Sequence, residues 1–136
     1  MDEKKIYAVY VDLLRIHKEF YGVKAFYNER EAFIQRLNLI NSKHNSYFCY
    51  AICEALRKWF LKGFGGLGKD NIKKYYADIW HFHKEYIGKV KCDVDYEKLT
   101  KEANTIASIY GTEECEEMLL AIVADLDANN KQQAGA

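Results

Sequence analysis

The chain contains no proline, and glycines end several of its amphipathic segments. Proline is the residue that most strongly interrupts a helix, because it lacks a backbone donor and clashes with the preceding turn. A glycine just after a stretch of apolar residues spaced by three and four is typical of a helix C-terminus. Four glycines have this position: Gly22, Gly63, Gly88 and Gly111. The pattern predicts an all-α fold.

The same periodicity predicts about six helices. We expect them to begin near Glu3, at Asp93 or Asp95, and after the N-cap candidates Asn28, Ser46, Asp70 and Thr112. No segment shows the sustained alternation of a strand, and we find no internal repeat and no linker long enough to separate two domains. We therefore expect one irregular helical bundle over residues 1–127, followed by a disordered C-terminal tail over residues 128–136, which is polar and rich in small residues.

Length and composition agree with a single packed domain. The chain has 136 residues, of which 49% are hydrophobic and 29% charged, so a disordered or fibrous protein is excluded. The inward positions of the predicted helices form the expected core: Leu13, Phe33, Leu37, Ile52, Leu56, Trp59, Ile79, Trp80, Leu99, Ile106, Leu119 and Ile122.

No apolar run approaches the roughly 18–20 residues that a membrane span needs. The charged N-terminal residues 1–5 also lack the apolar stretch of a secretory signal. We therefore expect a cytoplasmic protein with no membrane association.

Charge is unevenly distributed although the net charge is zero. Residues 57–91 hold nine lysines and arginines against three acids, and residues 92–127 hold ten acids against two lysines. The basic and acidic segments either face each other or face water, or one of them presents its charge to a partner. The sequence leaves both interpretations open.

A glycine-rich stretch over residues 63–70 matches the dinucleotide pattern GxGxxG and part of the phosphate-binding P-loop. Both patterns require a strand before the loop, whereas the preceding segment is predicted to be a helix. We therefore expect no nucleotide or other cofactor.

Metal and catalytic motifs are also missing. The four cysteines contain no C-x-x-C pair, and the Asp78, His81 and Glu85 row on one predicted helix has no second motif to complete a di-metal site. Neither GxSxG nor HExxH occurs. We expect no catalytic residues and no metal ligands, and hence no enzyme.

The many aromatic residues exceed what single inward stripes can bury, and interfaces favour exposed aromatic rings. We expect a partner-binding surface of rings that lie off the stripes, of apolar residues in the glycine loop, and of two lysines at its rim. Its predicted members are Tyr47, Tyr50, Phe64, Leu67, Lys73, Lys74 and Tyr75. The alternative is that these rings cover small satellite clusters of the core.

The sequence therefore predicts a non-enzymatic protein-interaction module, an inhibitor or a regulatory subunit. It would dock to a protein partner or to a second copy, through its acidic C-terminal helices or through the aromatic and glycine-loop surface. The alternative is a nucleic-acid-binding regulator, in which residues 57–91 neutralise phosphates with lysines and stack rings on bases. The net charge of zero argues against this alternative.

Overall fold

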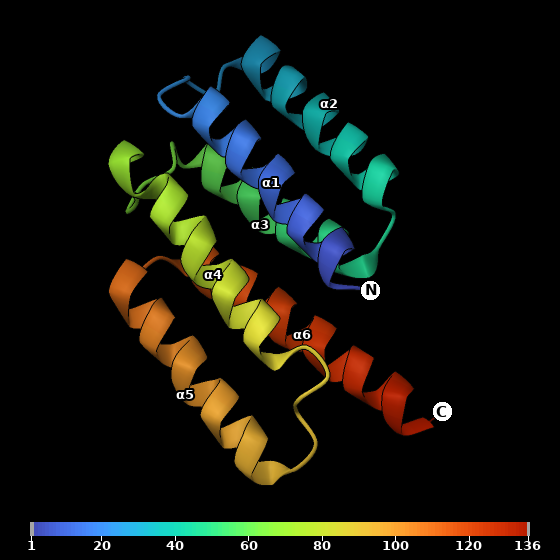
Figure 1. The fold of residues 1–136 in the computed structure, drawn as a ribbon. Coiled ribbons are helices and arrows are strands. Elements are labelled where there is room, and N and C mark those ends of the chain that lie inside the picture. The colour runs from blue at the N-terminus through green and yellow to red at the C-terminus, as the bar shows by residue number, and fades with distance from the viewer. Residues whose placement is uncertain (1, 136) are drawn as a thin grey trace.

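The computed structural model describes the backbone of residues 2–135 and the side chains of residues 2–129. This part of the chain folds into six α-helices without strands, which confirms the predicted fold class (Figure 1). The helices are α1 (Glu3–Phe20), α2 (Tyr27–His44), α3 (Tyr47–Leu61), α4 (Ile72–Tyr86), α5 (Asp93–Tyr110) and α6 (Glu113–Gly135). A short 3-10 helix, η1 (Lys69–Asn71), precedes α4.

Two of the predicted N-caps are confirmed by hydrogen bonds. The hydroxyl of Ser46 accepts from the backbone N–H of Cys49 at 3.1 Å, and the hydroxyl of Thr112 accepts from that of Cys115 at 3.0 Å. Asp70 does not cap α4, because it lies within η1.

Asn28 is not a cap either, since α2 already begins at Tyr27. Of the two expected starts of α5, Asp93 is the first helical residue. Asp95 lies in the first turn and accepts from the backbone N–H of Lys91 at 2.9 Å.

Helix α6 is the longest, with 23 residues. Its helical backbone continues to Gly135 and so includes most of residues 128–136, for which the sequence predicts a disordered tail. The disorder of this segment stays a prediction. None of the helices in the described part of the chain is both long and apolar enough to span a membrane.

The six helices form two units of three. Within each unit, α1–α3 or α4–α6, every helix contacts the other two. The units meet through α1 against α4 and through α3 against α6, while α2 and α5 lie on opposite outer edges (Figure 1). This arrangement gives each helix of the first unit a counterpart in the second.

The two units are an internal repeat, so the expectation of no repeat is wrong. Residues 66 positions apart in the sequence occupy equivalent places in the two units, and the equivalent caps Ser46 and Thr112 are one such pair. The turns before these caps also agree, since Asn45 and Gly111 both have positive φ, 44° and 63°. The identical pairs are Ile6/Ile72, Tyr10/Tyr76, Asp12/Asp78, His17/His83, Lys18/Lys84, Glu19/Glu85, Gly22/Gly88, Glu31/Glu97, Asn38/Asn104, Ile40/Ile106, Ser42/Ser108, Cys49/Cys115 and Ala55/Ala121.

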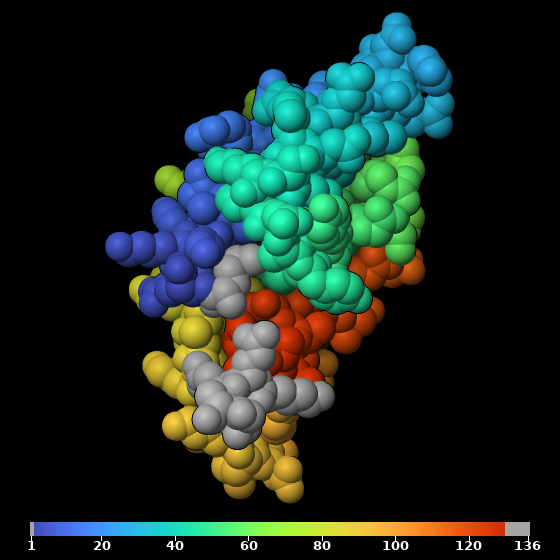
Figure 2. Space-filling view, turned by 90° about the vertical axis from the view of Figure 1, so that its right-hand side faces the viewer, coloured from blue at the N-terminus to red at the C-terminus, as the bar shows by residue number. Residues whose placement is uncertain are grey.

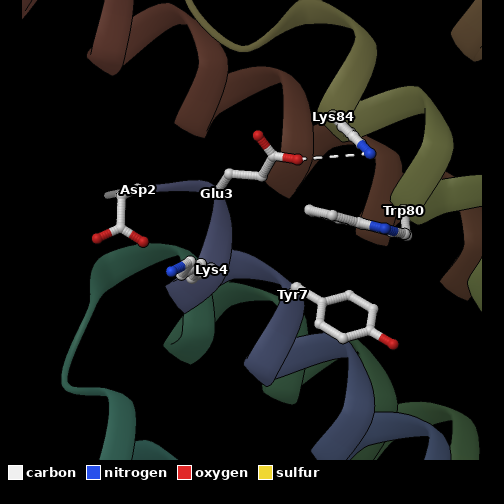
Figure 3. Close-up of a pocket in the computed structure, with 6 residues that line it drawn as sticks. All are labelled: Asp2, Glu3, Lys4, Tyr7, Trp80 and Lys84. Atoms are coloured by element: carbon white, nitrogen blue, oxygen red, sulfur yellow. Dashed lines mark ion pairs between the residues drawn. The ribbon is translucent and has the colours of Figure 1, made fainter.

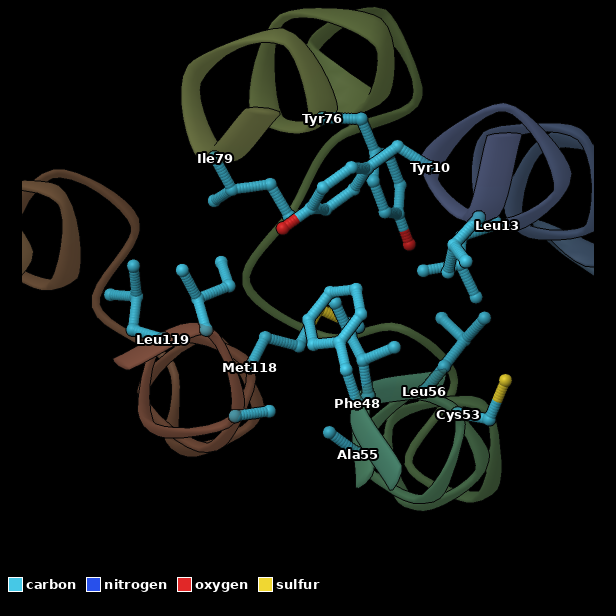
Figure 4. Packing of buried hydrophobic residues seen from close by; sticks show 14 of the residues in the cluster. Tyr10, Leu13, Phe48, Cys53, Ala55, Leu56, Tyr76, Ile79, Met118 and Leu119 are labelled. Carbon is cyan, nitrogen blue, oxygen red and sulfur yellow. The ribbon is translucent and has the colours of Figure 1, made fainter. Parts of the chain in front are cut away.

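The contact between α1 and α4 is reciprocal. The hydroxyl of Tyr10 lies 2.8 Å from Nδ1 of His83, and the hydroxyl of Tyr76 lies 2.7 Å from Nδ1 of His17. Figure 4 shows the two tyrosine rings entering the core from these two helices. Reciprocal contacts between equivalent residues are the signature of a twofold interface. The two units are therefore related by a pseudo-twofold axis.

The predicted core is confirmed with two exceptions. Trp80 is only half-buried, because it packs against Tyr7 and Tyr10 at the open edge of the α1 and α4 pair. Ile106 is half-buried because α5 lies at the periphery. The remaining predicted core residues are buried: Leu13, Phe33, Leu37, Ile52, Leu56, Trp59, Ile79, Leu99, Leu119 and Ile122.

Candidate docking groove

A groove of about 310 Å³ runs between α5 and α6. Helix α6 is one of the segments exposed on the face shown in Figure 2, where it emerges below α2. The groove is mainly apolar, with a single charged residue at its edge. Its lining residues are Ala103, Asn104, Ala107, Glu116, Leu119, Leu120 and Val123.

The groove exists because the second unit lacks a large side chain that the first unit has. Leu37 of α2 is buried and packs in the core, whereas its counterpart on α5 is Ala103. Helix α2 buries three large apolar side chains, while Leu99 is the one residue of α5 that is buried. A side chain with three fewer carbon atoms leaves space between the helices.

Two positions on α6 beside the groove are charged in the first unit and apolar in the second. In the first unit, Glu54 and Arg57 of α3 form an ion pair of 2.6 Å. Their counterparts on α6 are Leu120 and Val123, and Leu120 is 68% exposed. The second unit therefore exposes a leucine where the first unit has a charged side chain.

Most of the acidic residues at the start of α6 face α3 and are neutralised there. Lys62 pairs with Glu113 at 3.3 Å and with Glu114 at 3.0 Å, and Lys58 pairs with Glu117 at 3.4 Å. The interpretation that the basic and acidic segments face each other is confirmed for these residues.

Glu116 points to the other side of α6, into the groove, and none of the ion pairs among the described residues involves it. Lys98 and Lys101 are the two lysines of residues 92–127, and both line a different cleft, between α4 and α5. The charge at the groove itself is therefore negative.

The seven residues predicted to bind a partner do not form one surface. Tyr47 and Tyr50 are 83% and 51% exposed, at the start of α3. Lys73 and Lys74 are exposed at the start of α4, which follows the loop at the opposite end of α3. With a rise of 1.5 Å per residue, the two ends of α3 are about 21 Å apart. Partner binding by these four residues stays a prediction, now for two separate places.

The other three predicted residues, Phe64, Leu67 and Tyr75, are buried, so their expected exposure is wrong. The ring of Phe64 stacks on His17 with a centroid distance of 4.1 Å. The hydroxyl of Tyr75 donates to the sulfur of Met118 at 3.1 Å. Tyr75 is inside because α4 contacts three other helices and buries more than one stripe. For these residues, the alternative that they cover the core is confirmed.

The basic and aromatic segment over residues 57–91 buries most of its rings, and Trp80 is half-buried. Trp59, Tyr75, Tyr76, Phe82 and Tyr86 are all buried, so they are not available to stack on bases. At least five of its cationic side chains pair with carboxylates: Arg57, Lys58, Lys62, Lys74 and Lys84.

Another cleft, of about 710 Å³, lies between the N-terminus of α1 and α4 (Figure 3). Tyr7 and Trp80 pack together there with a centroid distance of 5.3 Å, and Lys84 pairs with Glu3 at 3.5 Å. Asp2 and Lys4 complete the lining, so the cleft holds two acids and two lysines. Its balanced charge favours neither an anionic nor a cationic ligand.

The buried histidines belong to the core rather than to an open site. Burial lowers the pKa of His17 to about 3, so its ring is neutral at neutral pH. His83 is also fully buried, with its two ring nitrogens bonded to Tyr10 and Asp125. Among the described residues, no group of three or more histidines, cysteines and acids is placed to hold a metal ion.

Sequence reasoning missed the groove residues Ala103, Ala107, Leu120 and Val123. The signal that reveals them is the comparison of residues 66 positions apart, which shows where the second unit has lost bulk and charge. None of the protein-family models, curated proteins and solved structures compared with the chain matches it.

Proposed function

We propose that the chain is a non-enzymatic protein-interaction module, an inhibitor or a regulatory subunit, that docks a protein partner through its acidic C-terminal helices. The docking site is the groove between α5 and α6. One observation carries this proposal: the first unit has the buried Leu37 and the charged pair Glu54 and Arg57 at the equivalent positions, whereas the second has Ala103 and exposes Leu120.

The comparison between the units supplies the energetic argument. Both units have the same helix order, and α3 and α6 have equivalent caps, so the fold itself requires neither the groove nor the exposed leucine. Apolar surface in water costs about 25 cal/mol per Å², and a partner that covers Leu120 and Val123 recovers this free energy. The nucleic-acid alternative has less support, because most of the rings that it requires are buried.

Affinity capture with the full chain tests the proposal. The immobilised protein is incubated with a lysate of the organism that makes it, and the bound proteins are quantified by mass spectrometry. The test variant is Leu120→Glu, which gives the second unit the residue that Glu54 supplies in the first. The control is Leu39→Glu, because Leu39 is equally exposed, at 67%, on the distant helix α2.

We expect a protein that binds the wild type and Leu39→Glu and is lost with Leu120→Glu. The purified partner should then bind the wild type and Leu39→Glu, and it should not bind Leu120→Glu. The proposal is wrong if both variants retain the same bound proteins as the wild type.

A further inference from the structure

We infer that the occupant of the groove is an amphipathic helix of another protein, with a leucine-sized side chain over Ala103 and a lysine or arginine at Glu116. This inference rests on the proposed function and specifies the chemistry of the partner.

The size of the missing side chain defines the apolar part of the occupant. Leu37 fills the equivalent space in the first unit and is 4% exposed there, whereas Ala103 leaves it open. A partner leucine that enters above Ala103 would restore the packing that the first unit makes within one chain. Close packing of this kind requires a side chain of matching volume.

The shape of the groove favours a helical occupant. Helices α5 and α6 are joined by the short turn at Gly111, and at their far ends the hydroxyl of Tyr96 donates to Asp127 at 2.6 Å. The two helices are therefore antiparallel, and they form a straight groove between them. Ala103 and Ala107 lie one turn apart on its floor, and such small residues allow another helix to approach closely. Docking of an amphipathic helix into an apolar groove is a common mode of recognition.

The charge of the groove favours a basic partner. Glu116 is its one charged lining residue, and the lysines of α5 face a different cleft. A second copy docked face to face would place Glu116 of one copy against Glu116 of the other. Both lie in the acidic segment over residues 92–127, which has ten acids and two lysines. Like charges at an interface oppose association, so the same features that attract a cation disfavour this dimer.

The experiment measures the binding of three synthetic peptides to the full chain by fluorescence anisotropy. Each peptide is an 18-residue helix with the same leucine stripe, and its polar face carries lysine, glutamine or glutamate. We expect the lysine peptide to bind at least tenfold more tightly than the glutamate peptide. Glu116→Gln should reduce the preference for lysine over glutamine.

Filling the groove is the second arm of the experiment. Ala103→Leu copies the leucine of the first unit, and we expect it to weaken lysine-peptide binding at least tenfold without lowering the melting temperature. Ala107→Leu fills the groove one turn further along and replaces Ala103→Leu if that variant does not fold. Leu39→Glu is the control and should bind like the wild type.

Three results would overturn the inference: equal or tighter binding of the glutamate peptide, unchanged lysine-peptide binding after the groove is filled, or a dimer in sedimentation that Leu120→Glu dissociates. In each case, a partner captured through Leu120 would still support docking at this groove. Failure of the inference can therefore be distinguished from failure of the proposed function.

Discussion

Nε2 of His83 lies 2.8 Å from a carboxylate oxygen of Asp125, whereas the equivalent nitrogen of His17 has no hydrogen-bond partner among the described residues. The difference follows from one position of the repeat, because the counterpart of Asp125 is Trp59, which packs edge-on against His17 at 5.1 Å. A carboxylate accepts, so Nε2 of His83 donates to Asp125, while Nδ1 is hydrogen-bonded to the hydroxyl of Tyr10. The hydrogen-bond network of Tyr10, His83 and Asp125 therefore joins α1, α4 and α6.

Loss of this hydrogen-bond network should destabilise the fold. Asp125→Ala removes the acceptor and leaves a buried N–H without a partner, which costs about 1–3 kcal/mol. Urea unfolding of the variant should show a lower midpoint with an unchanged slope. Glu116→Gln, which changes an exposed carboxylate on the same helix, serves as the control and should unfold like the wild type. A midpoint for Asp125→Ala equal to that of the control would contradict this role.

The buried His17 should make stability fall as the pH falls. Its pKa is about 3 in the folded state and about 6.5 when the chain is unfolded, so between these values only the unfolded state binds the proton. Stability should then decrease by up to about 1.4 kcal/mol per pH unit below pH 6.5. The measurement is the free energy of unfolding between pH 6.5 and 4.5 for the wild type and for His17→Gln. The variant should have the shallower slope, and equal slopes would show that His17 is not neutral in the folded protein.

A position that is positively charged in the first unit and negatively charged in the second offers a stabilising substitution. Glu19 pairs with Arg36 at 2.7 Å in the first unit, but their counterparts Glu85 and Glu102 are both acids. Burial and a hydrogen bond with Glu102 raise the pKa of Glu85, as two close carboxylates require. Glu102→Arg should stabilise the protein by about 0.5 kcal/mol, since exposed ion pairs contribute little. Glu97→Arg is a charge-matched control, and an equal gain in thermal stability from both variants would rule out a specific pair.

Exchange of leucine and alanine between positions 37 and 103 should change the stability of the protein differently at the two positions. Leu37→Ala opens a groove in the first unit and should cost about 2–5 kcal/mol, because Leu37 is buried. Ala103→Leu should leave stability unchanged or higher. Differential scanning calorimetry of both variants measures this, and a large loss from Ala103→Leu would show that the groove lacks room for a leucine.

The local sequence features predicted the fold class well because caps and apolar stripes act within a few residues. Ser46 and Thr112 are such signals, and both form their hydrogen bonds. The expectation that Tyr75 is exposed is wrong because it assumes that α4 has one buried face, whereas α4 packs against three helices. The repeat is hard to recognise in the sequence because its halves carry different residues at many equivalent positions. Tyr50 and its counterpart Glu116 are one such pair.

The groove itself gives no positive signal in the sequence. It is created by what Ala103 lacks, and an alanine in a helix looks ordinary until it is compared with Leu37. Tertiary packing, rather than local propensity, decides such a site.

The most direct test of docking at the groove is the affinity of the captured partner for the wild type and for Ala103→Leu, measured with the melting temperature of each protein. Docking at the groove predicts at least a tenfold loss of affinity for Ala103→Leu, with a melting temperature no lower than that of the wild type. Equal affinity of the two proteins, with the variant fully folded, would contradict it.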